Sequence, residues 1–463
     1  MSPPDVGLLP LYVRFYDEVL PDLLGQLEPF LERVRSSLEA GGLRLLAAPV
    51  GRTREDFARA VEHFEGAGAD AILTLHLAYS PSLESADVLA ATPLPVILLD
   101  TTPDREFGPG TDPGRLLFNH GVHGLQDLAS VLRRKGKPYR VVAGHLDDPE
   151  LVPRCARFVR AARAARAMHR MRALRIGGVF PGMGDFAVDD AVLREKLGIA
   201  VENILPSALA GDIAGVQPSA VAAEMDADRE RYRVCCPPEV HERSVRVGLG
   251  LRRFLERGPF GAFSLNFLSF QDSDGPVSTV PFLECCQAMA RGIGYAGEGD
   301  VLTASLVGAL ARGFGAATFT EIFCADWAGQ SLFLSHMGEL NPAQTADVPV
   351  LYEKEFPFTP ARNPATLAGA PPPGPATFVN LAPGPGGSFH LIAAPVEVLA
   401  DGTHPDLPRW VRGWIRPPAP LERFLEDYSH LGGTHHAALV PGHHGEALAA
   451  LATFLKIDFH LLA

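Results

Sequence analysis

Short segments that are almost entirely apolar alternate with helical segments through the first third of the chain, and this alternation limits the folds open to it. Residues 71–77, 96–100 and 139–144 are predicted strands, and residues 23–40 and 53–65 are predicted helices. Near-continuous apolar strands are typical of parallel sheets, which are buried on both faces, and the helices supply the crossover connections. The pattern therefore predicts a doubly wound α/β domain with ligands at the carboxyl ends of its strands.

A chain of 463 residues is too long for one compact core, and changes of pattern suggest three domains. We expect an N-terminal α/β domain over residues 1–172, a second doubly wound, Rossmann-like α/β domain over residues 173–317, and a mostly antiparallel domain over residues 318–463. An arginine-rich helix, predicted over residues 151–175, leads into the second domain. Its basic stripe is typical of a solvated or subunit-contact face.

The composition excludes some classes of function. The net charge of −13 argues against nucleic acid as the main partner, because phosphate binding needs a basic surface. The N-terminus lacks the pattern of a signal peptide, and no apolar run is long enough to span a membrane, so we expect a cytoplasmic protein with a small-molecule partner. Six cysteines without a CxxC motif predict no disulfide framework.

Two glutamates near the middle of the chain suggest chemistry. Glu298 lies in a glycine-flanked turn just before a predicted helix over residues 301–312. In the next predicted strand, Glu321 shares a face with Phe319 and Phe323 on the two-residue period of a strand. A carboxylate between aromatic side chains is costly to bury unless a cation or a proton compensates it.

Imidazoles follow in the same pattern. His336 is expected on the apolar face of a strand over residues 331–337, and the pair His435 and His436 follows two glycines near the C-terminus. Two carboxylates and two imidazoles suit a divalent cation such as Mn²⁺, Co²⁺ or Mg²⁺. A tetrahedral zinc with four protein ligands, which would be structural, is the alternative.

The segments GYAGEGD, FTEIF, LSHMGELNP and GGTHHA, in this order, resemble motifs of the L-arabinose isomerase and L-fucose isomerase-like family of metal-dependent aldose–ketose isomerases. The resemblance implies that Glu298, Glu321, His336 and His435 bind the metal, with His436 as the alternative to His435. It also implies Mn²⁺ or another divalent cofactor, a barrel-like C-terminal domain and a homo-oligomer, either hexamer or trimer. Glu298 and Glu321 would move the proton of an enediol route, and a hydride shift stays open.

Further residues enter through the same resemblance. His120 and His123 lie in a segment, NHGVHG, whose second histidine would reach the active site of a neighbouring subunit; alternatively, His123 begins the helix that runs to residue 134. Asp300 would support a metal ligand or cap the following helix. The implied sugar-binding residues are His123, His120, Met183, Phe267, Phe323 and His436.

Departures from the family pattern bear on the substrate. Val301 and Leu302 stand where the family has Trp-Lys, Phe323 where it has Tyr, Gly248 where it has a pocket Glu, and His120 where it has Gln. Because lost polar contacts leave substrate hydroxyls unpaired, we expect a sugar other than L-arabinose. The alternatives are a non-catalytic sugar sensor and an epimerase or lyase that uses the same enediolate chemistry.

Overall fold

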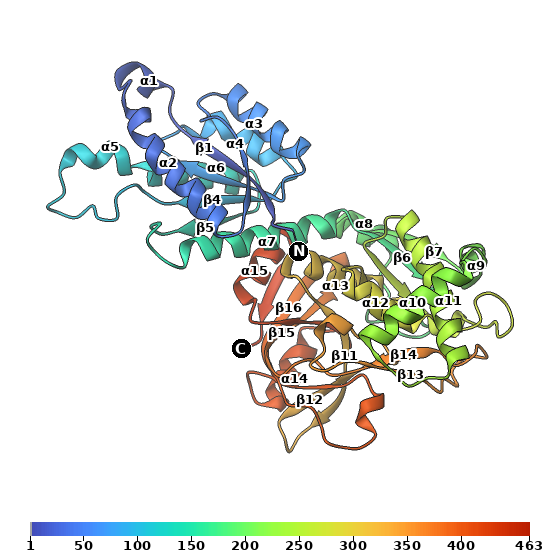
Figure 1. Ribbon diagram of the computed structural model, residues 1–463. Helices are drawn as coiled ribbons and strands as arrows, with labels where there is room; N and C mark the ends of the chain where they lie inside the picture. The colour runs from blue at the N-terminus through green and yellow to red at the C-terminus, as the bar shows by residue number, and fades with distance from the viewer. Residues whose placement is uncertain (1) are drawn as a thin grey trace. The chain divides into compact units, whose positions relative to one another are not determined.

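A computed structural model describes residues 2–463, and their contacts divide the chain into two units (Figure 1). Unit 1 comprises the residues up to 166 together with residues 449–456. Unit 2 comprises residues 167–448 together with residues 457–463. The second and third domains that the sequence predicted both fall mainly in unit 2, and their separation from each other stays a prediction.

Unit 1 is built on a parallel sheet, part of which is labelled in Figure 1. Its strand order is β2-β1-β3-β4-β5. From β1 the chain first adds β2 on one side and then adds β3, β4 and β5 in turn on the other side, so the order of the strands reverses at β1. The α/β fold with a parallel sheet that the sequence predicted is confirmed. The strands are β1 (Asp5–Leu11), β2 (Arg44–Ala47), β3 (Ala71–His76), β4 (Val96–Asp100) and β5 (Tyr139–Ala143).

Helices cover this sheet and close its core. Phe57 of α3, Leu128 of α6 and Leu98 of β4 belong to one fully buried cluster. Thr53 accepts a hydrogen bond from the backbone of Asp56, and Asp56 returns one, so a capping box starts α3. The helices are α1 (Phe15–Val19), α2 (Leu23–Ala40), α3 (Arg54–Gly66), α4 (Ser82–Ala91), α5 (Leu116–Asn119) and α6 (Gly121–Arg134).

The arginine-rich helix α7 (Leu151–His169) is shorter than predicted. The chain leaves the helix after His169 and enters strand β6 (Arg172–Ile176), whose Leu174 and Ile176 are fully buried. The prediction of a helix to residue 175 was wrong because β6 pairs with strands on both sides and buries these apolar residues. Burial in a sheet outweighs the helical propensity of the preceding alanines and arginines.

Unit 2 contains a second parallel sheet, with the order β10-β9-β6-β7. The helix that follows β10, α13, is buried along almost its whole length, so the turn before it is held firmly. The strands are β7 (Ala200–Ile204), β9 (Ala262–Leu265) and β10 (Gly294–Gly297), together with β6. The helices are α8 (Asp190–Leu197), α9 (Ala210–Ala214), α10 (Pro218–Arg231), α11 (Pro238–Arg257), α12 (Phe282–Ala290) and α13 (Val301–Phe314).

The C-terminal part of unit 2 forms a mostly antiparallel sheet in the order β15-β18-β11-β12-β17-β16-β19, and β15 also pairs with β16. The antiparallel character is confirmed. The sheet is not a closed barrel. The pairing of β16 with β17 is limited to Glu397–Arg416 and Val398–Ile415, and β19 adds in parallel beside β16. The strands are β11 (Thr318–Asp326), β12 (Ser331–Ser335), β15 (Gly374–Pro383), β16 (Phe389–Val398), β17 (Gly413–Arg416), β18 (His436–Pro441) and β19 (Asp458–Leu461).

A small sheet with the order β14-β13-β8 completes the strands of unit 2. Its members are β8 (Arg233–Val234), β13 (Val350–Glu353) and β14 (Ala365–Ala368), and the last helices of the chain are α14 (Leu421–His430) and α15 (Gly445–Leu455). The cysteines are free, as their spacing predicted. Among residues 2–463, no helix combines the length and the apolar character that a bilayer crossing requires.

Candidate metal centre

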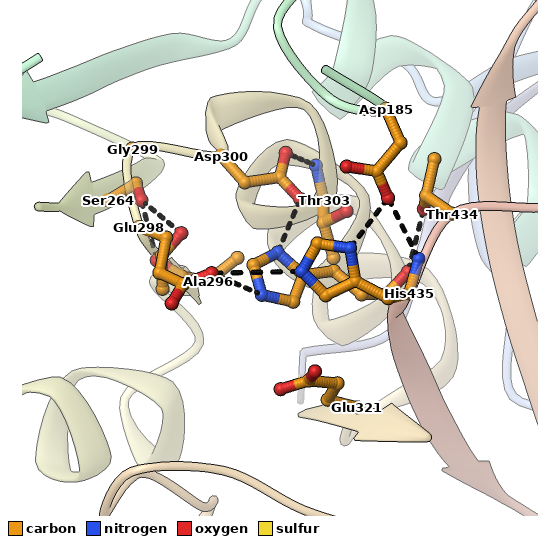
Figure 2. A network of polar contacts seen from close by, with 12 residues as sticks. Asp185, Ser264, Ala296, Glu298, Gly299, Asp300, Thr303, Glu321, Thr434 and His435 are labelled. Atoms are coloured by element: carbon orange, nitrogen blue, oxygen red, sulfur yellow. Dashed lines mark hydrogen bonds and ion pairs between the residues drawn. The ribbon is translucent and has the colours of Figure 1, made fainter. Parts of the chain in front are cut away.

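The turn between β10 and α13 presents Glu298. Glu298 has a φ of +64° and Gly299 a φ of +87°, both in the left-handed region that favours glycine. A Cβ atom on Gly297 would lie 2.5 Å from Cε1 of His336, and one on Gly299 would collide with the backbone of Gly178. The glycines therefore let this turn pack closely, and the carboxylate of Glu298 projects toward the imidazoles (Figure 2).

The antiparallel sheet brings the second carboxylate to the same place. In the pairing of β11 with β18, Glu321 lies opposite His436. On the other side of β11, Glu321 lies opposite Ser335 of β12, which directly precedes His336. Directly opposed residues in an antiparallel pair have Cβ atoms about 5 Å apart. Strand register therefore gathers Glu321, His336 and His436, and Figure 2 shows Glu321 pointing from its strand toward the imidazoles.

Two buried imidazoles are each held at Nδ1 by a buried carboxylate. Nδ1 of His336 lies 2.8 Å from Oε2 of Glu339, whose other oxygen accepts a hydrogen bond of 2.7 Å from the Tyr295 hydroxyl. Nδ1 of His436 lies 3.0 Å from Oδ2 of Asp300. A carboxylate at Nδ1 accepts a hydrogen bond from the ring N–H, which keeps the proton on Nδ1 and leaves the lone pair of Nε2 free. This is the usual arrangement behind a metal-bound histidine.

Asp300 caps α13 and also contacts His436, and its support of a metal ligand stays a prediction. Its Oδ1 accepts a hydrogen bond from the backbone of Thr303 and caps α13, while its Oδ2 holds His436. Because both oxygens are used and the side chain is fully buried, the carboxylate couples the start of the helix to the orientation of one imidazole.

The third imidazole, His435, is held from another direction. Asp185 Oδ2 accepts hydrogen bonds from both the backbone N–H of His435, at 3.0 Å, and Nδ1 of its ring, at 2.6 Å (Figure 2). Nε2 of His435 then lies 3.7 Å from Oε2 of Glu298. His435 therefore faces the same carboxylate as His436, but from a position nearer to solvent.

The Nε2 atoms of His336 and His436 are buried and have no hydrogen-bond partner in residues 2–463. They face carboxylates without hydrogen bonding to them: His436 Nε2 is 3.5 Å from Oε2 of Glu298, and His336 Nε2 is 3.8 Å from Oε2 of Glu321. A buried polar atom without a partner costs about 1–3 kcal/mol. Two such atoms directed at two carboxylates are typical of a site prepared for a cation.

Two triads of potential ligand atoms overlap at one residue. Glu298, His435 and His436 form one triad, and Glu321, His336 and His436 form the other, with the atoms of each triad within 4.8 Å of one another. His436 belongs to both. Carboxylate oxygen and imidazole nitrogen are ligands that divalent ions such as Mn²⁺ accept, so the residues present fit such an ion.

Electrostatics distinguish the two carboxylates. Burial alone would raise the pKa of Glu298, but its interactions with His435 and His436 outweigh burial and lower the pKa to about 2. Burial raises the pKa of Glu321, against the attraction of His336. Burial opposes the charge on His435, yet Asp185 and Glu298 raise its pKa to about 10. A bound cation would take the place of protons in this cluster, which is how metal binding couples to pH.

Aromatic rings close the site on its apolar side. Phe319 makes edge-on contacts with His336 and His436, with ring centroids 4.7 Å and 4.9 Å away. Phe186 stacks on His436 at 5.0 Å with an interplanar angle of 9°. These rings exclude water from the imidazoles and strengthen the electrostatic interactions among them.

Sequence reasoning did not identify Glu339, Asp185 or Phe186 as part of the site. Glu339 follows His336 by three residues in the motif LSHMGELNP, but this segment is not helical, so no periodicity relates the two. Asp185 is 250 residues from His435 in sequence. The short-range signal for Glu339 was its place in the motif; no local signal was available for Asp185.

The predicted sugar-binding residues of unit 2 lie at different positions around Glu298. Phe267, predicted in a strand, lies in a 3₁₀ turn (Phe267–Ser269) after β9 and is buried against Phe180, whose backbone N–H donates to the carbonyl of Glu298. Met183 lies in the same loop as Phe180. The prediction that Phe323 shares the face of Glu321 was wrong, because β11 has a bulge between Ile322 and Cys324 that leaves Phe323 42% exposed.

In unit 1, His120 and His123 lie with two tyrosines at the carboxyl edge of the sheet. His120 Nε2 is 3.1 Å from the hydroxyl of Tyr16, and the His123 ring stacks on Tyr79 with centroids 4.8 Å apart. His123 lies in the first turn of α6, as the helix interpretation predicted. Its contact with a substrate stays a prediction.

Family models match two parts of the chain that contain the candidate ligands. The model of the L-arabinose isomerase C-terminal domain matches residues 316–458, and the model of the L-arabinose isomerase central domain matches residues 183–312. The first range contains Glu321 and His336, and the second contains Glu298.

Similar proteins extend over almost the whole chain. The L-arabinose isomerase of Nocardioides sp. (strain ATCC BAA-499 / JS614) is 28% identical, with 96% of this chain and 91% of that protein covered. The L-arabinose isomerase of Shouchella clausii (strain KSM-K16) is 27% identical, with 98% and 92% covered. The L-arabinose isomerase of Klebsiella pneumoniae (strain 342) is 26% identical, with 90% and 86% covered.

Proposed function

The chain belongs to the L-arabinose isomerase-like family of aldose–ketose isomerases, and on that premise we propose that it interconverts an open-chain aldose and a ketose with the help of a divalent cation. The observation that carries the metal requirement is the pair of buried Nε2 atoms of His336 and His436, each without a partner and each directed at a glutamate. In both residues a buried carboxylate holds Nδ1, so each ring presents Nε2 alone toward a glutamate.

The proposed ligands are Glu298, Glu321, His336 and His436. The sequence favoured His435 over His436, but three features support His436: it belongs to both triads, it is fully buried, and it lies opposite Glu321 in the strand register. His435 then contacts the substrate. The proposed ion is Mn²⁺, with Co²⁺ and Mg²⁺ as substitutes.

Bound there, a divalent cation would supply Lewis-acid polarisation of the sugar carbonyl. The remaining chemistry belongs to the side chains. Moving hydrogen between C2 and C1 needs a base that removes a proton and an acid that returns it, and Glu298 and Glu321 are the groups placed for this. Phe319 and Phe186 keep bulk water away from the reacting carbons.

We propose a substrate other than L-arabinose. Val301 and Leu302, which stand where the family pattern has Trp-Lys, are buried at the start of α13. Gly248 packs within α11 against the side chain of Glu284, where a larger residue would crowd it. Loss of side-chain partners for substrate hydroxyls changes preference among sugars by large factors. Met183 and Phe267 remain the proposed apolar contacts.

We also propose that the protein acts as a homo-oligomer in which His120 and His123 of one copy serve the site of another. Unit 1 exposes several large apolar side chains, and two of them, Leu116 and Val122, lie close to His120 in sequence; exposed apolar side chains that gather in one region are typical of a contact surface. The exposed side chains include Phe15, Leu83, Phe107, Leu116 and Val122.

The experiment is turnover in D₂O. Metal-stripped protein is reloaded with Mn²⁺, Co²⁺, Mg²⁺ or Zn²⁺, incubated with a panel of aldoses and ketoses, and followed by NMR. Aldose–ketose conversion with deuterium incorporated next to the carbonyl supports the enediol route, and conversion without deuterium indicates a hydride shift. Glu298→Gln and Glu321→Gln should each abolish turnover, whereas Glu195→Gln, which alters an exposed glutamate, should not. Sugar binding without metal and without conversion would contradict the proposal.

A further inference from the structure

Three imidazole–carboxylate pairs converge on the site, and one of them differs from the other two. Asp300 and Glu339, which hold His436 and His336, are almost completely buried. The Asp185 side chain is 36% exposed and that of its partner, His435, is 30% exposed. The buried pairs are suited to hold a metal ligand in place. The exposed pair lies where a substrate molecule can reach it.

Asp185 also differs from Asp300 and Glu339 in the segment of chain that carries it. Asp185 lies in the loop between β6 and α8, in which Gly177, Gly178 and Gly182 adopt positive φ. This loop contacts the centre at two further points. The backbone N–H of Phe180 donates to the carbonyl of Glu298, and the ring of Phe186 stacks on His436.

The geometry at His435 leaves one orientation for its ring. One carboxylate oxygen of Asp185 accepts both the backbone N–H and the Nδ1–H of the same residue. The Nδ1 proton is therefore fixed on the side of Asp185, and Nε2 is directed toward the Glu298 carboxylate. A loop residue without an acceptor oxygen would leave this partly exposed ring free to rotate about its side-chain bonds.

We propose that Asp185 is a positioning residue, which holds His435 with Nε2 directed at the bound sugar. Only the predicted change in kcat rests on the proposed isomerase function; the predicted metal affinity and NMR behaviour do not. The proposal assigns Asp185 to the loop that bears the proposed substrate contact Met183, so one carboxylate orders the loop and the imidazole together.

The first test does not need a substrate. Asp185→Ala should change the affinity for Mn²⁺ by less than about threefold, whereas Asp300→Ala, which frees a proposed ligand, should lower it about 10–100-fold. In ¹⁵N-labelled protein, the Nδ1–H of the His435 ring should be hydrogen-bonded and protected from exchange with solvent, and Asp185→Ala should remove this protection. Asp185→Asn, which keeps an acceptor oxygen for Nδ1–H, should retain most of it.

The second test uses turnover. Asp185→Ala should lower kcat about 10–100-fold, and Asp185→Asn should lower it less. In a His435→Gln background, Asp185→Ala should cause no further loss, because a residue that acts through His435 has nothing left to position. Glu195→Gln is the matched control for removal of one carboxylate from unit 2.

The outcomes separate this proposal from the proposed function. Absence of sugar conversion by the wild-type protein with every metal would overturn the isomerase, while the Mn²⁺ and NMR measurements would still decide the role of Asp185. The Asp185 proposal fails if Asp185→Ala weakens Mn²⁺ binding as strongly as Asp300→Ala, if the His435 resonances do not change, or if the two substitutions are additive in kcat. Thermal unfolding of each variant identifies any loss of activity that is caused by misfolding. If Asp185→Ala does not fold, Asp185→Asn is compared with the wild type in its place.

Discussion

Histidines in the two units have opposite surroundings. In unit 1, His76 is completely buried beside the glycines of α6, neither ring nitrogen has a partner within residues 2–463, and burial lowers its pKa to about 3. In unit 2, His336 and His436 are equally buried, but each has a carboxylate at Nδ1. The comparison teaches that burial alone makes an imidazole neutral and inert, whereas burial with a carboxylate prepares Nε2 for a cation.

The largest expected effect comes from removing the ligand that both triads share. His436→Gln should lower Mn²⁺ affinity by more than about a hundredfold and make sugar turnover undetectable, since a ligand should matter more than its supporting partner. Titration of metal-stripped protein with Mn²⁺ measures the first effect. His435→Gln should bind Mn²⁺ nearly as the wild type does. If the two variants exchange these behaviours, His435 is the ligand.

Next in size is the removal of a supporting carboxylate. Glu339→Gln should lower Mn²⁺ affinity about 10–100-fold, because His336 loses the partner that fixes its tautomer. Asp127→Asn is the matched change in unit 1, where Asp127 accepts hydrogen bonds from Ser82 and no histidine depends on it for a metal. Its Mn²⁺ affinity should equal that of the wild type. If both variants lost Mn²⁺ affinity equally, the carboxylates of unit 2 would have no special role in metal binding.

A smaller effect concerns the pH dependence of stability. Burial lowers the pKa of His76 in the folded chain to about 3, below its ordinary value of 6.5, so the unfolded chain binds more protons between these values. The ring therefore has no effect on the pH dependence of stability above about pH 6.5. Below that pH, the free energy of unfolding falls by about 1.4 kcal/mol per pH unit because of His76. His76→Gln should remove this slope from urea unfolding measured between pH 6.5 and 4.5. His404→Gln, which alters an exposed ring, should keep it.

The smallest effect is expected from the proposed contribution of unit 1 to the sugar site of another copy. His123→Ala should raise KM about 3–10-fold through the loss of about 1 kcal/mol of hydrogen bonding, with Mn²⁺ affinity unchanged. His63→Ala, an exposed histidine of α3, is the control. A His123→Ala protein with wild-type KM for its best sugar would confine the site to unit 2.

Much of the fold could be predicted because its signals are local. The apolar runs that became β3 and β4, and the Thr53–Asp56 cap of α3, depend on neighbours in sequence. Where long-range pairing competes with local propensity, prediction failed. The segment after His169 carries helix-forming residues, yet it joins a sheet because strands from distant parts of the chain lie on both sides of it.

The site divides in the same way. Glu298 stood out because glycines flank it, and His336 because it follows an alternating strand. The choice between His435 and His436 needed the register of β18, which starts at His436 and places that residue opposite Glu321. Asp185 could not be found, because a loop residue with no periodicity meets its partner through tertiary structure alone.

The backbone of Glu298 has one further consequence. A non-glycine residue at a φ of +64° costs about 1–2 kcal/mol relative to its ordinary conformations. Glycine would relax the turn, so thermodynamic selection acting on the fold alone would replace this glutamate. The chain therefore gives up some stability at this bend to present an acidic side chain, and a Glu298→Gly change that relaxed the turn would also remove a proposed metal ligand.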